Sequence, residues 1–207
     1  AEFTQGELVE LLGREDFSPI YAQADQVRAE TVGDTVHIRA LLEISNHCRR
    51  MCTYCGLRAP RQNLTRYRMD PEEVVQAACE AHAVGYRTIV LQSGEDPWYT
   101  PLMLGQIVSA IKAKTDMAVT LGCGEMREED YAFLKLAGTD RYLIKHETAD
   151  PDLYRRLHPD SSLDKRVGCL RTLKRLGYET GSGFMVGLPG QTLETLAQDL
   201  LLLASIP

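Results

Sequence analysis

Three cysteines crowd into a stretch that directly follows the first predicted strand. Residues 43–56 read Glu43-Ile44-Ser45-Asn46-His47-Cys48-Arg49-Arg50-Met51-Cys52-Thr53-Tyr54-Cys55-Gly56. Gaps of three and two residues let one tight loop place three thiolates around a small [4Fe–4S] cube. Because only three cysteines are local, one iron would lack a protein ligand and stay open to chemistry, by the logic that separates catalytic from structural zinc sites. The spacing therefore predicts an open-sited iron–sulfur cluster held by Cys48, Cys52 and Cys55.

Two other interpretations compete for these cysteines. Unrelated core cysteines are disfavoured, because Asn46, Arg49 and Arg50 give the segment the composition of a loop. A zinc site completed by His47 or a distant residue would need an awkward chelate, since His47 adjoins Cys48, and zinc sites more often show a second cysteine pair. A zinc-stabilised binding module is the alternative that is not an enzyme.

The composition is that of an ordinary globular protein. The chain has 207 residues, of which 44% are hydrophobic and 25% charged, enough for one domain with a sizeable core. No apolar run approaches the ~20 residues that span a bilayer, and the net charge of −6 argues against nucleic-acid binding. The acidic, polar residues 1–7 do not resemble a secretory signal. We therefore expect a cytoplasmic chain with reduced cysteines, and neither nucleic acid nor membrane as a partner.

Short apolar segments alternate with amphipathic helices along the chain. This alternation predicts parallel βαβ units in an α/β fold, either a curved, barrel-like sheet or an open, doubly wound one. In both folds ligands bind at the carboxyl ends of the strands. Strands are predicted at residues 37–44, 88–91, 117–121, 141–144 and 180–186, and helices at 5–12, 18–30, from 70, and at 102–114, 128–137, 161–176 and 192–205.

The cysteine motif resembles the signature of the radical S-adenosylmethionine (SAM) superfamily, with Tyr54 as its aromatic residue. The resemblance implies an enzyme that uses a [4Fe–4S] cluster and SAM. The methionine end of SAM would chelate the open iron, and one electron from the cluster would cleave SAM to a 5′-deoxyadenosyl radical. The radical chemistry belongs to the cofactor, while the protein supplies binding and the exclusion of water.

Loops after the second and fourth strands offer candidate SAM-binding residues. Residues Gln92, Ser93, Gly94 and Glu95 resemble the superfamily's Gly-Gly-Glu element, which binds the SAM amino group; the alternative is a solvated turn. Glu147 would accept hydrogen bonds from the ribose hydroxyls, or would simply pair with Lys145.

Two later segments complete the predicted SAM site. Arg166 would pair bidentately with the SAM carboxylate, or is an exposed helix arginine. Dense glycines around Met185 would let the adenine lie against the backbone. The compatible alternative is a tight strand-to-helix turn in which Thr192 caps the last helix.

Four segments together resemble a narrower family, the HydE-type [FeFe]-hydrogenase maturases: residues 45–58, 91–97, 146–151 and 185–192. The resemblance extends from about residue 8 to 207 and implies a (β/α)8 barrel. It also implies a part in building the two-iron subcluster of the hydrogenase active site (the H-cluster), from a small-molecule or organometallic iron substrate. Other maturases and an electron donor are the implied partners. Lys145 replaces the family's usual arginine, which weakens bidentate anion binding there.

Only five βα units are present where the family has eight. We therefore expect one radical SAM domain over residues 1–207, with helices in 1–35 and a truncated barrel in 36–207. The remaining units and any auxiliary cluster would lie beyond Pro207. Methylornithine synthase and biotin synthase share the barrel and are alternative enzymes. Biotin synthase is disfavoured, because residues 88–91 and 117–121 hold no cysteine for a second cluster.

Overall fold

Five strands pair in chain order, all parallel, in the computed structural model, which describes residues 3–206. Doubly wound sheets reverse their strand order at a switch point, whereas a barrel adds each strand beside the previous one. The order β1-β2-β3-β4-β5 therefore confirms the partial-barrel prediction over the open sheet. The strands are β1 (Ala40–Ser45), β2 (Thr88–Ser93), β3 (Ala118–Gly122), β4 (Arg141–Leu143) and β5 (Glu179–Gly181).

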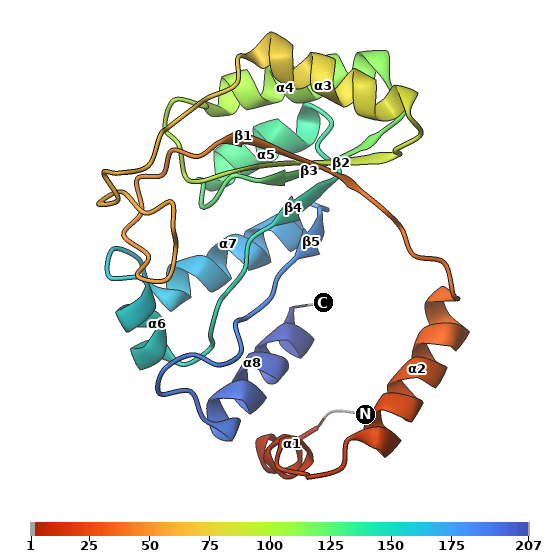
Figure 1. Cartoon of the computed structure of the whole chain (residues 1–207), viewed down its shortest axis with the longest axis vertical. Coiled ribbons are helices and arrows are strands. Elements are labelled where there is room, and N and C mark those ends of the chain that lie inside the picture. The colour runs from red at the N-terminus through yellow and green to blue at the C-terminus, as the bar shows by residue number, and fades with distance from the viewer. Residues whose placement is uncertain (1–2, 207) are drawn as a thin grey trace.

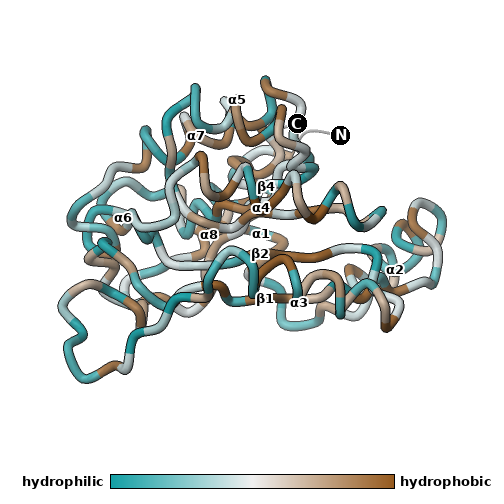
Figure 2. Tube along the Cα trace, turned by 90° about the horizontal axis from the view of Figure 1, so that it is seen from above, coloured by the Kyte–Doolittle hydropathy of each residue, from teal (hydrophilic) through white to brown (hydrophobic). Residues whose placement is uncertain are grey.

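Helices precede and connect the strands (Figure 1). A single core lies between the sheet and α3, α4, α5 and α7. Alternate strand residues such as Ile89 and Leu91 enter it, and so do helix residues such as Leu104 and Ile111. Figure 2 shows hydrophobic residues along much of β1 and β2, while α6 is mostly hydrophilic. The helices are α1 (Gln5–Leu12), α2 (Ser18–Val32), α3 (Pro71–Ala83), α4 (Pro101–Lys114), α5 (Glu128–Leu136), α6 (Pro151–Leu157), α7 (Leu163–Arg175) and α8 (Leu193–Ser205).

The first and last helices pack against each other, although they lie far apart in the sequence (Figure 1). Thr4 caps α1 in a capping box with Glu7, and Thr192 caps α8, as predicted. By contrast, α2 has no buried residue. Within residues 3–206, no helix combines the length and the hydrophobicity needed to cross a membrane.

Two predicted strands have the wrong bounds. The first begins at Ala40 rather than at residue 37, because His37 and Ile38 are exposed and contribute nothing to the core. The fifth ends at Gly181 instead of extending to 186. Beyond it, a single isolated bridge joins Phe184 to Glu147. Glycines at 181 and 183 offer no side chain to pack against the sheet, so the apolar run there does not extend the strand.

The helix predictions failed at two places. Helix α6 was not predicted, although Asp150 caps it and Pro151 occupies its first turn, both recognisable start signals. As a result, α7 begins at Leu163 with Ser162 as its cap, not at residue 161. The pair Ser18-Pro19 predicts the start of the second helix with Ser18 as its cap, but Ser18 is the first helical residue and Phe17 is the cap.

Candidate functional site

The segment that carries the three cysteines, residues 46–58 (the cluster loop), leaves β1 at the carboxyl edge of the sheet. Cys48, Cys52 and Cys55 are all free and only partly buried. The backbone N–H of Arg50 donates to Cys48 Sγ at 3.4 Å, and that of Leu57 donates to Cys55 Sγ at the same distance. Iron–sulfur proteins tune their clusters through such hydrogen bonds to sulfur. The loop thus offers three thiols with backbone donors already aimed at two of them.

The three thiols are a donor set for three irons of a cube, whereas the zinc alternative would need a fourth ligand. Among residues 3–206, no three His, Cys, Asp or Glu side chains are arranged to hold one metal ion. Burial, and then the neighbouring Cys48 and Cys55 thiols, raise the pKa of Cys52 to about 11.

Gly94 lets the cluster loop approach the end of β2. A Cβ at this position would lie 2.3 Å from the His47 carbonyl oxygen and 2.6 Å from Cys48 Cβ. A backbone hydrogen bond joins the next residue on each side, because Arg49 N donates to the Glu95 carbonyl oxygen at 3.0 Å. The close approach expected at Gly94 is therefore used by the protein's own cysteine loop.

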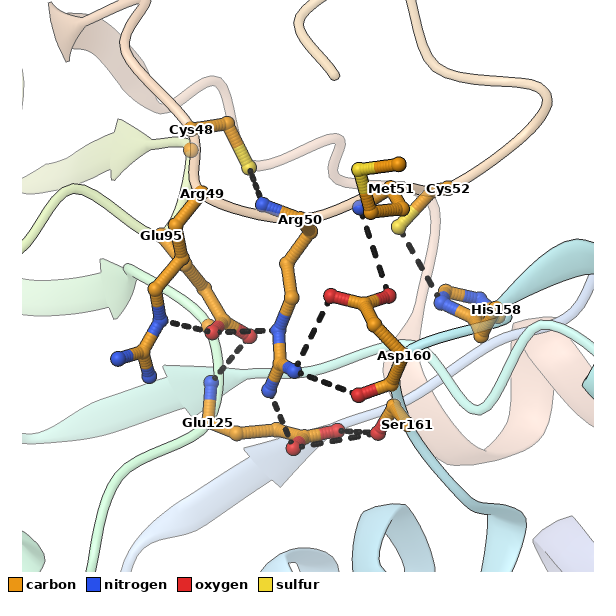
Figure 3. A network of polar contacts seen from close by, with 12 residues as sticks. Cys48, Arg49, Arg50, Met51, Cys52, Glu95, Glu125, His158, Asp160 and Ser161 are labelled. Carbon is orange, nitrogen blue, oxygen red and sulfur yellow. Dashed lines mark hydrogen bonds and ion pairs between the residues drawn. The ribbon is translucent and has the colours of Figure 1, made fainter. Parts of the chain in front are cut away.

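Four buried charged side chains, Arg50, Glu95, Glu125 and Arg166 (the central network), join the cluster loop to β2, β3 and α7. Arg50 Nε lies 2.7 Å from Glu95 Oε2, and Arg50 Nη2 lies 2.7 Å from Glu125 Oε2 (Figure 3). Arg166 Nε donates to the other oxygen of Glu125 at 2.8 Å. None of these side chains is more than 10% exposed. Buried ions persist only where they are paired, so this network fixes the loop relative to the strand ends.

Charge pairing keeps Glu125 ionised within this network. Burial opposes the ionisation, but the Arg166 and Arg50 guanidinium groups outweigh it and hold the pKa of Glu125 below its ordinary 4.5. The exposed Lys165 ammonium adds a third cationic contact at 3.2 Å. Glu125 is therefore an anion that gathers cationic groups from two separate elements.

Glu95 and Arg166, both predicted to bind SAM, meet in this network. Glu95 Oε1 accepts from Glu125 N at 3.0 Å, and Oε2 accepts from Arg50 and, more distantly, Arg49. Arg166 Nη1 donates to the Lys145 carbonyl oxygen at 2.8 Å. The alternatives of a solvated Glu95 turn and an exposed Arg166 are wrong, because both residues are 8% exposed. Their roles toward SAM stay predictions.

Glu147 lies in an unusual backbone conformation just past β4. Its φ of 67° is in the left-handed region, which non-glycine residues seldom adopt. Its Oε2 is buried without a hydrogen-bond partner among residues 3–206, so the alternative pairing with Lys145 does not satisfy it. Burial raises the pKa of Glu147. Burial, and then the charge of Glu147, raise the pKa of Tyr54. A buried, unpartnered acceptor is a candidate ligand-binding position.

The other predicted cofactor residues line the same edge of the sheet. Gln92 is exposed and pairs with Gly122 of β3, and Ser93 Oγ donates to the Gly94 carbonyl oxygen at 2.7 Å. Met185 is half-buried, and its N–H donates to the Glu147 carbonyl oxygen at 3.0 Å. The structure thus brings Met185 to Glu147, while Gln92 and Ser93 lie at the neighbouring strand end.

A cavity of about 330 Å³ opens between the loops that follow β2 and β3. It borders Glu95, Cys123, Glu125 and Lys165, but none of the three cysteines of the cluster loop. It adjoins the central network without enclosing Tyr54 or Glu147, so we do not assign it to SAM.

Sequence reasoning missed Arg50 and Glu125 of the central network. It also missed two residues that contact the cluster loop: His158, whose Nδ1 lies 3.2 Å from Cys52 Sγ, and Asp160, whose carbonyl oxygen accepts from Arg50 Nη1 at 3.2 Å (Figure 3). Glu125 had a usable signal, because an acidic residue after the third strand follows a glycine, as Glu95 does after the second. Gly124 has a φ of 85°, and a Cβ there would lie 2.0 Å from Glu95 Cγ. His158 and Asp160 follow α6, and missing that helix hid both.

Asp96 provides a pH-dependent anchor beside the site. Burial disfavours its charge, but hydrogen bonds from Arg68 and Ser45 hold the pKa of Asp96 below its ordinary 3.8. A lowered carboxyl pKa contributes stability that is complete above 3.8 and is lost as the pH falls through the lower folded value. We expect Asp96→Asn to cost about 1–3 kcal/mol at pH 7, and less below pH 3.8.

Urea unfolding at pH 7 and pH 3 measures this difference. Asp34→Asn is the matched control, because Asp34 pairs with Arg28 while its side chain is 88% exposed. A gap between wild type and Asp96→Asn that stays constant with pH would contradict the assignment.

Comparisons with known proteins match this chain to one superfamily. A family model described as "Radical SAM superfamily" matches residues 42–203. The [FeFe] hydrogenase maturase subunit HydE of Thermotoga maritima is 54% identical over 205 residues, which cover 98% of this chain and 59% of that protein. The crystal structure of a methylornithine synthase (PylB) superposes with a TM-score of 0.90 at 26% identity, over 99% of this chain and 62% of that one. The X-ray structure of the FeFe-hydrogenase maturase HydG from Carboxydothermus hydrogenoformans superposes with a TM-score of 0.88 at 25% identity. The match covers 99% of this chain and 49% of that one. The chain therefore spans about three-fifths of the length of its HydE relative.

Proposed function

The chain belongs to the radical SAM superfamily, and from that premise we propose that it holds the [4Fe–4S] cluster and SAM of a [FeFe]-hydrogenase maturase. The observation that carries the proposal is the cluster loop, with three free thiols above the carboxyl edge of a parallel sheet. The bound cluster would supply the electron that cleaves SAM to a 5′-deoxyadenosyl radical. In this assignment Cys48, Cys52 and Cys55 would hold three of the irons and leave the fourth open to SAM.

The chain's own residues would bind and orient SAM. The unpartnered oxygen of Glu147 is suited to accept from the ribose hydroxyls. Glu95 and Arg166 would face the amino and carboxylate ends of the methionine moiety, across Glu125. The SAM amino group would displace Arg49 from Glu95, because the Arg49 side chain is 55% exposed and its Nε lies 3.3 Å from Glu95 Oε2.

The maturase assignment rests on the 54% identity to HydE, against 27% for the 3-methylornithine synthase of Methanosarcina barkeri. It implies a small organometallic iron substrate for the H-cluster, with other maturases and an electron donor as partners, in the cytoplasm. The TM-score of 0.90 to a methylornithine synthase keeps that reaction as the second candidate.

Anaerobic reconstitution tests the proposal. The protein is loaded with iron and sulfide, then incubated with SAM and dithionite, and 5′-deoxyadenosine is quantified. A brown protein that releases 5′-deoxyadenosine supports the radical SAM function, and a colourless zinc protein excludes it. Adding an iron complex with cysteine, carbon monoxide and cyanide then distinguishes a maturase from an enzyme that produces 3-methylornithine.

Glu95→Gln and Arg166→Met are each expected to weaken SAM binding about tenfold, because each removes one charged contact worth roughly 1.4 kcal/mol or more. Equilibrium binding to the reconstituted protein measures the effect. Lys165→Ala is the control, since its side chain is 58% exposed although it also contacts Glu125. Unchanged SAM affinity in both network variants would refute the assignment.

A further inference from the structure

His158 lies between two residues of the cysteine motif. Its Nδ1 is 3.2 Å from Cys52 Sγ, and its Nε2 is 3.1 Å from the Tyr54 hydroxyl oxygen. Figure 3 shows the imidazole directed at the Cys52 sulfur. One side chain from outside the cluster loop therefore contacts both the second cysteine and the aromatic residue of the motif.

Packing holds this imidazole in place. His158 is 1% exposed and stacks on Tyr154, with the ring centroids 4.5 Å apart and the planes inclined by 16°. Its backbone is fixed too, because His158 N donates to the Tyr154 carbonyl oxygen at 2.8 Å. Thr53 N donates to the Leu157 carbonyl oxygen at 2.9 Å, which binds the cluster loop to the end of α6. These contacts fix the backbone of His158 beside the cluster loop and pack its ring face against Tyr154.

The partners decide which nitrogen carries the proton. A cysteine that ligates iron is a thiolate and can only accept a hydrogen bond, so Nδ1 must donate to it. In a neutral imidazole the other nitrogen is then an acceptor. Nε2 therefore accepts from the Tyr54 O–H. The two contacts satisfy both ring nitrogens in a single tautomer, assigned from the partners of the ring.

We propose that His158 is a positioning residue that donates a hydrogen bond to the Cys52 thiolate and thereby raises the reduction potential of the cluster. This inference rests on the proposed function, in which Cys52 is an iron ligand. A reduced cluster carries one more negative charge than the oxidised one, so a donor at its thiolate stabilises the reduced form more. The electron itself comes from an external reductant such as dithionite.

The midpoint potential of the reconstituted wild type and variants, measured by EPR-monitored redox titration, tests the proposal. His158→Phe keeps an aromatic ring against Tyr154 and removes the donor. We expect its ratio of reduced to oxidised cluster at fixed potential to fall roughly tenfold, a shift of about 59 mV to more negative values for one electron. His158→Asn restores an N–H donor without the ring stack, and is expected to recover most of this shift. His82→Phe, on the outer helix α3, is the matched control and should not shift the potential.

Each outcome bears on one claim. If the wild type binds no cluster, the proposed function fails. If the wild-type cluster cleaves SAM and His158→Phe keeps both its iron and the wild-type potential, only the role of His158 is overturned. If His158→Phe loses its iron, pulsed EPR on the reduced wild type labelled with ¹⁵N-histidine decides. A histidine nitrogen coupling that persists in His82→Asn and vanishes in His158→Asn supports the hydrogen bond, and its absence from the wild type overturns it.

Discussion

Replacing Cys52 with alanine is expected to abolish both the iron–sulfur cluster and SAM cleavage. The cluster loop offers only three thiols, and two thiolates cannot hold a cube that already has an open iron. No replacement is at hand: Cys123 and Cys169 are buried, and Cys79 lies in the outer helix α3. After anaerobic reconstitution, iron should fall from about four atoms per chain to below one. The charge-transfer absorbance and 5′-deoxyadenosine formation should fall to background.

The matched control is Cys79→Ala, which removes a partly buried thiol from α3 and should keep full iron content. Far-ultraviolet circular dichroism distinguishes a lost ligand from a lost fold. Cys52 is only partly buried, so its truncation should cost little stability. A Cys52→Ala protein that retained its iron and still cleaved SAM would disprove the assignment of all three cysteines as one ligand set.

The cysteine motif could be recognised from the sequence because its chemistry is local. Three sulfurs within eight residues are close together in any compact loop, whatever surrounds them. The strand ends could also be predicted from the sequence. Apolar segments bounded by glycine and polar residues locate the carboxyl edge where Glu95 and Glu147 lie. The β5 prediction failed where glycines interrupt an apolar run, since hydrophobicity alone does not provide side chains that pack.

The pairing of charges within the central network could not be predicted in this way. Arg49 and Arg50 are neighbours in the sequence, yet the side chain of Arg49 is 55% exposed and that of Arg50 only 10%. What distinguishes them is the position of Glu125, 75 residues away along the chain. That distance is bridged only when β2 and β3 pair in register and bring their carboxyl ends together. Partners of a buried charge are therefore a property of the tertiary fold, and local patterns carry no record of them.

Arg50→Ala is accordingly expected to cost about 3–5 kcal/mol of folding free energy, because it leaves Glu95 and Glu125 buried beside an absent partner. Arg49→Ala, one residue away, is the matched control and should cost about 1 kcal/mol or less, since its contact is largely solvated. Urea unfolding of the iron-free chains at pH 7 measures both changes. Similar losses in the two variants would contradict the burial that separates these arginines.

A double-mutant cycle then assigns the Arg50 effect to charge rather than to packing. Adding Glu95→Gln to an Arg50→Met chain removes a buried carboxylate that has lost its nearest cationic partner and leaves a side chain of similar size. The double variant should therefore be more stable than Arg50→Met alone, with a coupling energy of about 1–3 kcal/mol. Strictly additive losses would mean that Arg50 acts through its volume. If the coupling is found, iron uptake should decrease from wild type to the double variant to Arg50→Met, the order of their stabilities. The reason is that Arg50 lies within the loop that carries the cysteines, and its side chain joins that loop to the ends of β2 and β3.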